Sequence, residues 1–328
     1  MDNTLCIPRT PQLESPSPHP GELVHQEPQP ETESAPNPAQ HNSLMTGSQI
    51  VEIFHNQQLP DVTTYFRGPD GDPVSLGSSG HLYHARCARG EAAIRTIRIF
   101  MAQTNSNQLL LKAAADELLV WLQLQHEFLT PLWGVACFRE QAALVSPWMP
   151  YGNIIDYRRQ QPYFDWQKMC TQVSSAVAYL HDNGVIHGDI KAQNVLVSED
   201  GNAKVTGFSN SLLRELASHY RDGNDFSTLS MRWIAPEVLE GASARSEAVD
   251  VYALGMTILE IITGKVPFDE VSSDQGVIFQ VITRTAPTRP QELASNDRLW
   301  ALLTQCWSSD PKARPTAREV YDQLKDVA

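Results

Sequence analysis

The sequence predicts an α+β fold of two lobes, a small lobe rich in β-strands followed by a larger helical lobe. Short β-type runs broken by glycines occupy residues 74–100, and two further runs end at residues 143–145. After Pro150 the apolar residues recur mostly with a helical period. The predicted organisation is a tail at 1–45, a helical lead-in at 46–59, a small lobe at 60–146 and a large lobe at 147–328.

The tail is predicted to be disordered. Residues 1–45 are rich in Pro, Glu, Gln and Ser, and they cannot bury enough apolar surface to offset the entropy of the chain. The Pro-x-x-Pro stretch from Pro8 to Pro11 could dock in the groove of an SH3 or WW domain. The composition favours the simpler alternative, a solvating tail.

Individual helices are predicted from apolar periodicity and from capping residues. The lead-in helix is expected at 47–58, capped by Ser48 and stopped before Pro60. A small-lobe helix is expected at about 108–125, with one face formed by Leu110, Ala114, Glu117, Leu118 and Trp121. The large-lobe helices are expected at 166–183, 250–263, 299–306 and 317–327.

Charge and composition exclude several classes of partner. The 328 residues carry a formal net charge of −13, which argues against an extended surface for nucleic acid or anionic membranes. The apolar stretch at 251–262 is interrupted by Gly255 and Glu260 and is too short to span a bilayer. Five widely spaced cysteines form no disulfide or metal pattern, and no signal peptide opens the chain. We therefore expect a cytoplasmic protein with no nucleic-acid or membrane partner.

Residues 187–194, His-Gly-Asp-Ile-Lys-Ala-Gln-Asn, carry the most informative chemical pattern. An Asp and an Asn five positions apart can bring a carboxylate and an amide oxygen to a phosphate-transfer site. There the carboxylate accepts the proton of a substrate hydroxyl, and the amide oxygen holds a magnesium ion.

Read with Gly207-Phe208-Ser209 and Ala235-Pro236-Glu237, this segment resembles the catalytic segment of the protein kinase family. The resemblance covers roughly residues 60–328 and is closest to the tyrosine-kinase-like group, particularly the kinases of mushroom-forming fungi. It implies a two-lobed kinase fold that uses ATP and Mg²⁺ if it is active, with no cofactor as the alternative. The implied partners are proteins, either as substrates or as signalling partners.

The resemblance also implies which residues form the site. Asp189, Lys191 and Asn194 match the catalytic residues, and Asn194 is also the implied metal ligand. The implied nucleotide contacts are Gly77, Gly80, Leu82, Ala93, Arg95, Glu117, Met149 and Leu196. For the stretch around Gly77 and Gly80, a plain hairpin turn is the alternative to a phosphate-binding loop.

Four positions depart from the family pattern. Arg95 stands where the family has its strand lysine, and Gly207 stands where it has the aspartate that binds magnesium. Gly188 replaces the arginine of the catalytic segment, and Ser75 replaces the first loop glycine. The leading hypothesis is therefore a pseudokinase, a signalling or scaffold module with residual or no ATP binding. The alternative is a weakly active ATP-dependent protein kinase that phosphorylates Ser/Thr, or Tyr, on proteins.

Specific contacts are expected from the same resemblance. Arg95 should pair with Glu117, or alternatively touch a phosphate oxygen. The aspartate of the large-lobe helix, Asp250, should brace the catalytic loop. Arg314 and Glu237 should form a buried ion pair. A hydrophobic column is expected from Trp121, His187 and Phe208, and an adenine-binding hinge from Ser146, Pro147 and Met149.

Overall fold

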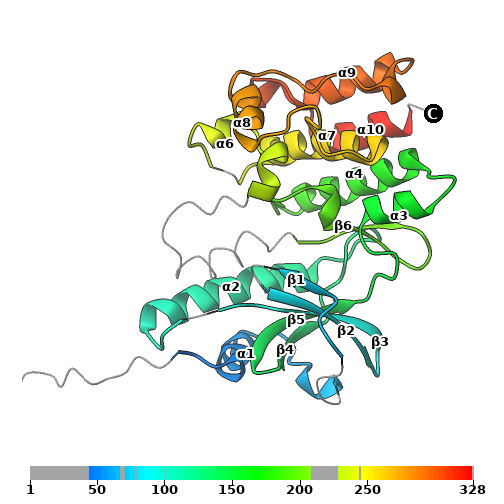
Figure 1. Ribbon diagram of the computed structural model, residues 1–328. Coiled ribbons are helices and arrows are strands. Elements are labelled where there is room, and N and C mark those ends of the chain that lie inside the picture. Colours follow the sequence, from blue (N-terminus) through cyan, green and yellow to red (C-terminus); the bar gives the residue numbers. More distant parts are fainter. Residues whose placement is uncertain are drawn as a thin grey trace, which may run out of the picture. The chain divides into compact units, whose positions relative to one another are not determined.

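A five-stranded antiparallel sheet forms the small lobe, in the order β1-β2-β3-β5-β4 (Figure 1). Its strands are β1 (Ser75–Gly77), β2 (Gly80–Cys87), β3 (Gly90–Thr96), β4 (Gly134–Phe138) and β5 (Gln141–Pro147). In the register of the sheet, Leu82 lies opposite Arg95, and Arg95 lies opposite Leu144. Since side chains alternate between the faces of a strand, Leu82, Ala93 and Arg95 share one face.

The computed structural model describes residues 44–66, 71–77, 80–99, 101–207, 228–243 and 245–326. The predicted tail, apart from its last two residues, and its Pro-x-x-Pro stretch lie outside these described residues, as does Phe208 of the predicted column.

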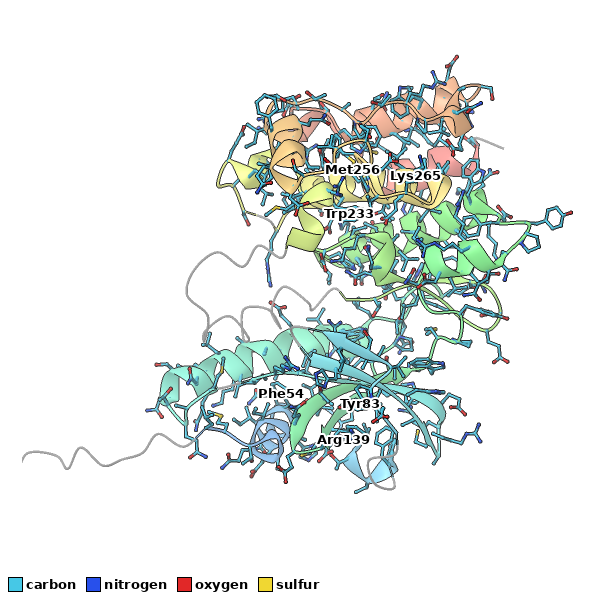
Figure 2. All side chains as sticks on the ribbon, in the orientation of Figure 1. Phe54, Tyr83, Arg139, Trp233, Met256 and Lys265 are labelled. Atoms are coloured by element: carbon cyan, nitrogen blue, oxygen red, sulfur yellow. The ribbon has the colours of Figure 1, made fainter. Side chains whose placement is uncertain are left out.

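Helix α1 (Gly47–Asn56) is the predicted lead-in helix, but its cap is not the predicted Ser48. Thr46 caps the helix, because its hydroxyl accepts the Gln49 N–H while the Gln49 side chain accepts the Thr46 N–H. Ser48 lies inside the first turn, where its Oγ is 3.3 Å from Cys137 Sγ. The apolar face of α1 packs on β4, β5 and α2 (Asn105–Gln123), with Phe54 fully buried (Figure 2).

Helix α2 begins three residues before the predicted start because Thr104 caps it. It shares a hydrophobic core with Leu144, which lies opposite Arg95, so it packs on the sheet face that carries Arg95. Its buried residues are Leu111, Ala114, Ala115, Leu118 and Trp121. The Trp121 indole donates to the carbonyl of Thr130, 2.8 Å away, which fixes the end of the helix. Glu117 lies at the edge of the buried face, where it is one-third exposed.

The large lobe consists mainly of helices, together with the short hairpin β6 (Val195–Val197) and β7 (Ala203–Val205). The helices are α3 (Ile154–Gln160), α4 (Trp166–Asp182), α6 (Pro236–Leu239), α7 (Glu247–Thr263), α8 (Asp274–Ile282), α9 (Asp297–Cys306) and α10 (Ala317–Lys325). The predicted large-lobe helices are confirmed, with boundaries that differ by three residues or fewer. Every residue of α7 from Val249 to Ile262 is buried, so this helix forms the centre of the lobe. No helix among the described residues is long and apolar enough to cross a membrane.

Candidate active site

Asp250 on α7 holds the start of the 187–194 loop. Its carboxylate accepts the N–H groups of His187 at 2.7 Å and Gly188 at 2.8 Å. His181 Nε2 lies 3.0 Å from the same carboxylate, which is fully buried. Two backbone donors on one carboxylate fix the path of the loop, so the structure places Asp250 where the sequence predicted it.

Asp189, Lys191 and Asn194 converge at the end of this loop. The amide nitrogen of Asn194 donates to Asp189 Oδ2 at 2.8 Å and to the Asp189 carbonyl at 2.6 Å. Lys191 Nζ lies 3.2 Å from Asp189 Oδ1. The Asp189 carboxylate is therefore oriented from both sides, as a general base must be. The same contacts would also brace the loop in a protein without activity.

His187 joins this loop to the strand that ends beside it. Its Nδ1 accepts the N–H of Asp189 at 3.1 Å, and its Nε2 faces the carbonyl of Thr206 at 3.1 Å. These partners require a neutral ring with its proton on Nε2. Burial keeps the pKa of His187 below its usual range, against the opposing effect of nearby Asp250, which supports the same form.

Gly207 follows Thr206, the residue whose backbone contacts both His187 and Asn194. The N–H of Thr206 donates to the carbonyl of Asn194 at 2.9 Å, so Gly207 follows directly after the residue bound to Asn194. Gly207 is buried, with φ of +87°. The backbone at Gly207 thus lies close to Asn194, and a glycine brings no carboxylate to this position.

Glu260 is a site residue that sequence reasoning missed. Its Oε2 accepts the N–H of Ala192 and the indole N–H of Trp233, both at 3.1 Å. Burial raises its pKa to about 7, although both donors oppose that shift. The sequence did contain a signal, because an acidic residue in the apolar run 251–262 must find polar partners when it is buried.

The residues predicted to contact a nucleotide come from both lobes. Leu82, Ala93 and Arg95 share the sheet face toward α2, and Ala93 lies opposite the hinge residue Ser146. Met149 follows β5 and is buried, and Leu196 lies in β6 with its side chain half-buried. No described residue accepts the backbone N–H of Met149, and its contact with adenine stays a prediction.

Gly80 has a structural reason to be glycine. It lies opposite Gly77 in the β1–β2 pair, with φ of +154°. A Cβ at this position would collide with the carbonyl oxygen of Thr96. Sheet packing alone therefore explains Gly80, which supports the plain-turn alternative, and its contact with a phosphate stays a prediction.

Comparison with known proteins identifies the family. Residues 71–324 match the sequence profile of protein tyrosine and serine/threonine kinases. The chain belongs to this protein kinase family.

Three proteins similar to this chain are named as protein kinases. Serine/threonine-protein kinase STY46 of Arabidopsis thaliana is 28% identical over 262 residues, which cover 79% of this chain and 44% of that protein. Mitogen-activated protein kinase kinase kinase 4 of Mus musculus is 28% identical over 263 residues, covering 78% and 16% respectively. A probable LIM domain-containing serine/threonine-protein kinase of Dictyostelium discoideum is 33% identical over 175 residues, covering 53% and 17%. The chain spans less than half the length of these relatives.

The ion pair predicted between Arg95 and Glu117 is not among the ion pairs of the described residues. Glu117 pairs with Arg245, at 2.8 Å between Nη1 and Oε1. Arg245 lies in the segment between α6 and α7, and no pattern in the sequence connects this segment with α2.

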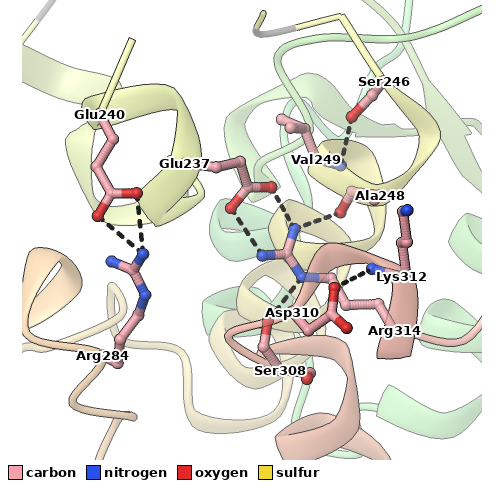
Figure 3. Close-up of polar contacts among 10 residues, drawn as sticks. All are labelled: Glu237, Glu240, Ser246, Ala248, Val249, Arg284, Ser308, Asp310, Lys312 and Arg314. Carbon is pink, nitrogen blue, oxygen red and sulfur yellow. Dashed lines mark hydrogen bonds and ion pairs between the residues drawn. The ribbon is translucent and has the colours of Figure 1, made fainter. Parts of the chain in front are cut away.

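The predicted ion pair between Arg314 and Glu237 is present (Figure 3). The two guanidinium nitrogens of Arg314 donate to the two carboxylate oxygens at 2.6 and 2.8 Å. Arg314 also donates to the carbonyls of Ala248 and Ser308, so each of its three guanidinium nitrogens has a hydrogen-bond partner. Burial tends to raise the pKa of Glu237, but the Arg314 guanidinium outweighs it and holds that pKa below its usual range.

Proposed function

We propose that this kinase domain is a pseudokinase that acts by binding proteins, with residual or no ATP binding and little or no phosphoryl transfer. The observation that carries this proposal is Gly207 beside Asn194. Magnesium is held through one or two carboxylates together with substrate phosphates. Gly207 brings no carboxylate to Asn194, so this position does not fit a magnesium ion bound in the family manner.

The size of the missing interaction decides between a slow enzyme and an inactive one. Charge stabilisation by a metal ion contributes several kcal/mol to a transition state. A loss of ~4 kcal/mol slows a reaction roughly a thousandfold. Arg95, Gly188 and Ser75 also depart from the family pattern around the same phosphate site. Four departures at one site support the interpretation that this site is not maintained for catalysis.

A pseudokinase of this kind would serve as a signalling or scaffold module. The relatives named above are protein kinases, whose names imply protein substrates, so the partner that we propose for this chain is also a protein. The Asp250 and Arg314 contacts support such a role, because they stabilise the large lobe without involving Gly207.

Repairing the site tests the proposal. Gly207→Asp together with Arg95→Lys restores both missing groups, and a left-handed φ of +87° is one that Asp tolerates better than most residues. We expect phosphate transfer from ATP in the double variant and only background transfer in the wild type. Adding Asp189→Asn to the double variant should abolish the gain. Equal transfer by the wild type and the repaired variant would contradict the proposal.

A weakly active kinase is the second candidate, and the Asp189–Lys191–Asn194 contacts favour it. Asp189 would accept the proton of the acceptor hydroxyl, while Lys191 would offset the negative charge of the transferred phosphate. Because the relatives are named serine/threonine-protein kinases, Ser/Thr is the acceptor we infer for this candidate, with Tyr as the other outcome.

A further inference from the structure

The small lobe contains a cavity of about 300 Å³ that is separate from the candidate active site. Its walls come from the start of α1, from the residues that follow β3 and from the β4–β5 turn. None of the residues assigned to the catalytic loop, the hinge or the nucleotide contacts lines it. Its size lies at the lower end of the range for pockets that hold small ligands.

One side of this cavity is apolar. The apolar residues that line it are Leu44, Met45, Ile50, Ile97, Ile99 and Ala142. All of them are buried except Leu44, which is 49% exposed. Backbone hydrogen bonds hold this wall in place, because the Met45 N–H donates to the Met101 carbonyl at 2.8 Å and the Ile97 N–H donates to the Ala142 carbonyl at 2.7 Å. An aliphatic chain that covered Leu44 would remove apolar surface from water.

Arg98 brings a positive charge to this apolar wall. Its Nη2 lies 2.5 Å from His81 Nε2. A guanidinium can only donate, so His81 accepts this hydrogen bond as a neutral ring with its proton on Nδ1, which faces the Tyr83 hydroxyl at 3.5 Å. Arg98 is half-buried, and among the described residues it forms no ion pair with a carboxylate. A partly buried charge with a neutral partner gains from an anion that can pair with it.

The β4–β5 turn adds a second guanidinium at the rim of the cavity. Arg139 lies over the Tyr83 ring, 4.7 Å from its centroid, and donates to the carbonyl of Gly71 at 2.5 Å (Figure 2). Glu140 is the one carboxylate among the described lining residues, and it is exposed. Two guanidiniums and one carboxylate make this rim locally positive in a chain with a net charge of −13.

We propose that this cavity binds a small aliphatic carboxylate, with the carboxylate at Arg98 and the aliphatic chain along the apolar wall. A guanidinium and a carboxylate can form two parallel charge-assisted hydrogen bonds, which a neutral head group cannot match. The chain of the ligand would cover Leu44. This inference does not depend on whether the domain transfers phosphate, because no residue of the phosphate-transfer site takes part.

Binding of octanoate to the full chain, measured by calorimetry below the concentration at which octanoate forms micelles, tests the proposal. Octanamide has a similar chain with a neutral head, and we expect it to bind about tenfold more weakly. Arg98→Gln should weaken octanoate binding by about tenfold and leave octanamide binding unchanged. Leu44→Ala, at a half-exposed position, should weaken both ligands by about two- to fivefold, because it removes apolar contact surface.

The place of binding is checked by amide hydrogen exchange. Octanoate should slow exchange at residues 44–50 and 97–99, which line the cavity, and should leave residues 187–194 unchanged. Slower exchange confined to other parts of the chain would overturn the proposal, because the ligand would then occupy a different site.

Arg318→Gln is the matched control, because it removes an exposed guanidinium that pairs with Asp182 in the large lobe. It should leave octanoate affinity unchanged. Arg139→Gln, a change at an exposed position, should weaken octanoate binding by about two- to threefold and keeps the test available if Arg98→Gln does not fold. Absence of octanoate binding to the folded wild type, equal affinity for octanoate and octanamide, or unchanged octanoate affinity in the folded arginine variants of the cavity would overturn the proposal.

Discussion

At the scale of single residues, Glu260 carries an ionisable group that the fold makes costly to charge. Its pKa is raised to about 7 from an ordinary 4.5. The folded protein therefore binds more protons than the unfolded chain between these values. The resulting stabilisation is fully present below pH 4.5 and is lost as the pH rises through about 7.

Glu260→Gln should remove this pH dependence. The Gln side-chain oxygen can still accept the Ala192 and Trp233 N–H groups, but it cannot ionise. Relative to the wild type, the variant should gain on the order of 3 kcal/mol of unfolding free energy between about pH 5 and pH 8. Chemical denaturation at both pH values measures this gain. Glu292→Gln, a change at an exposed carboxylate, is the control, and an equal pH profile for the two variants would contradict the assignment.

Arg314 is the second residue whose removal should have a large effect. The Arg314 side chain is fully buried, so Arg314→Ala leaves Glu237 without its partner in a mostly buried site. We expect a loss of about 3–5 kcal/mol in the free energy of unfolding. Arg318→Ala breaks an exposed ion pair with Asp182 and should cost no more than about 1 kcal/mol. Similar losses in the two variants, measured by denaturant titration, would count against a special role for Arg314.

At the scale of elements, α1 belongs to the small lobe although it lies before the residues that match the family profile. The N–H of Gly47 donates to the carbonyl of Glu140, and the N–H of Met45 donates to that of Met101. These backbone bonds and the buried apolar face fix α1 against the sheet and α2. The helix should therefore contribute to the stability of the lobe.

Two phenylalanines provide a direct comparison. Phe54 on α1 is fully buried, whereas Phe279 on α8 is 68% exposed. Phe54→Ala should reduce the free energy of unfolding by about 3–5 kcal/mol, because it removes a buried ring and leaves a cavity. Phe279→Ala should change it by no more than about 0.5 kcal/mol. If the Phe54 variant unfolds at the same denaturant concentration as the Phe279 variant, α1 is not part of the folded core.

At the scale of the whole molecule, the sequence was sufficient for the two-lobed plan and for most helices. Apolar periodicity located α4, α7, α9 and α10, because each of these helices buries one face or is buried entirely. Exact helix starts were less predictable. At α1 both Thr46 and Ser48 are good caps by residue type, and only the capping box with Gln49 decides between them.

Contacts of the candidate site were predictable where they join residues close in the sequence, as for Asp189 with Asn194. They were also predictable where both residues belong to family motifs, as for Arg314 with Glu237. Contacts without such a motif were not predictable. Glu260 was visible only as an interruption in an apolar run, and nothing near Arg245 in the sequence indicates a contact with α2. Both depend on how separate elements come together in space, which periodicity does not encode.

We propose that the domain maintains the kinase fold but transfers little or no phosphate. The most direct test is radiolabelled phosphate transfer from ATP, with magnesium and separately with manganese. Wild type and Asp189→Asn, both shown to be folded, would be compared on themselves and on generic Ser, Thr and Tyr peptides. We predict the same background for both proteins. Transfer by the wild type that disappears in Asp189→Asn would contradict this account and establish an active kinase with an unusual metal site.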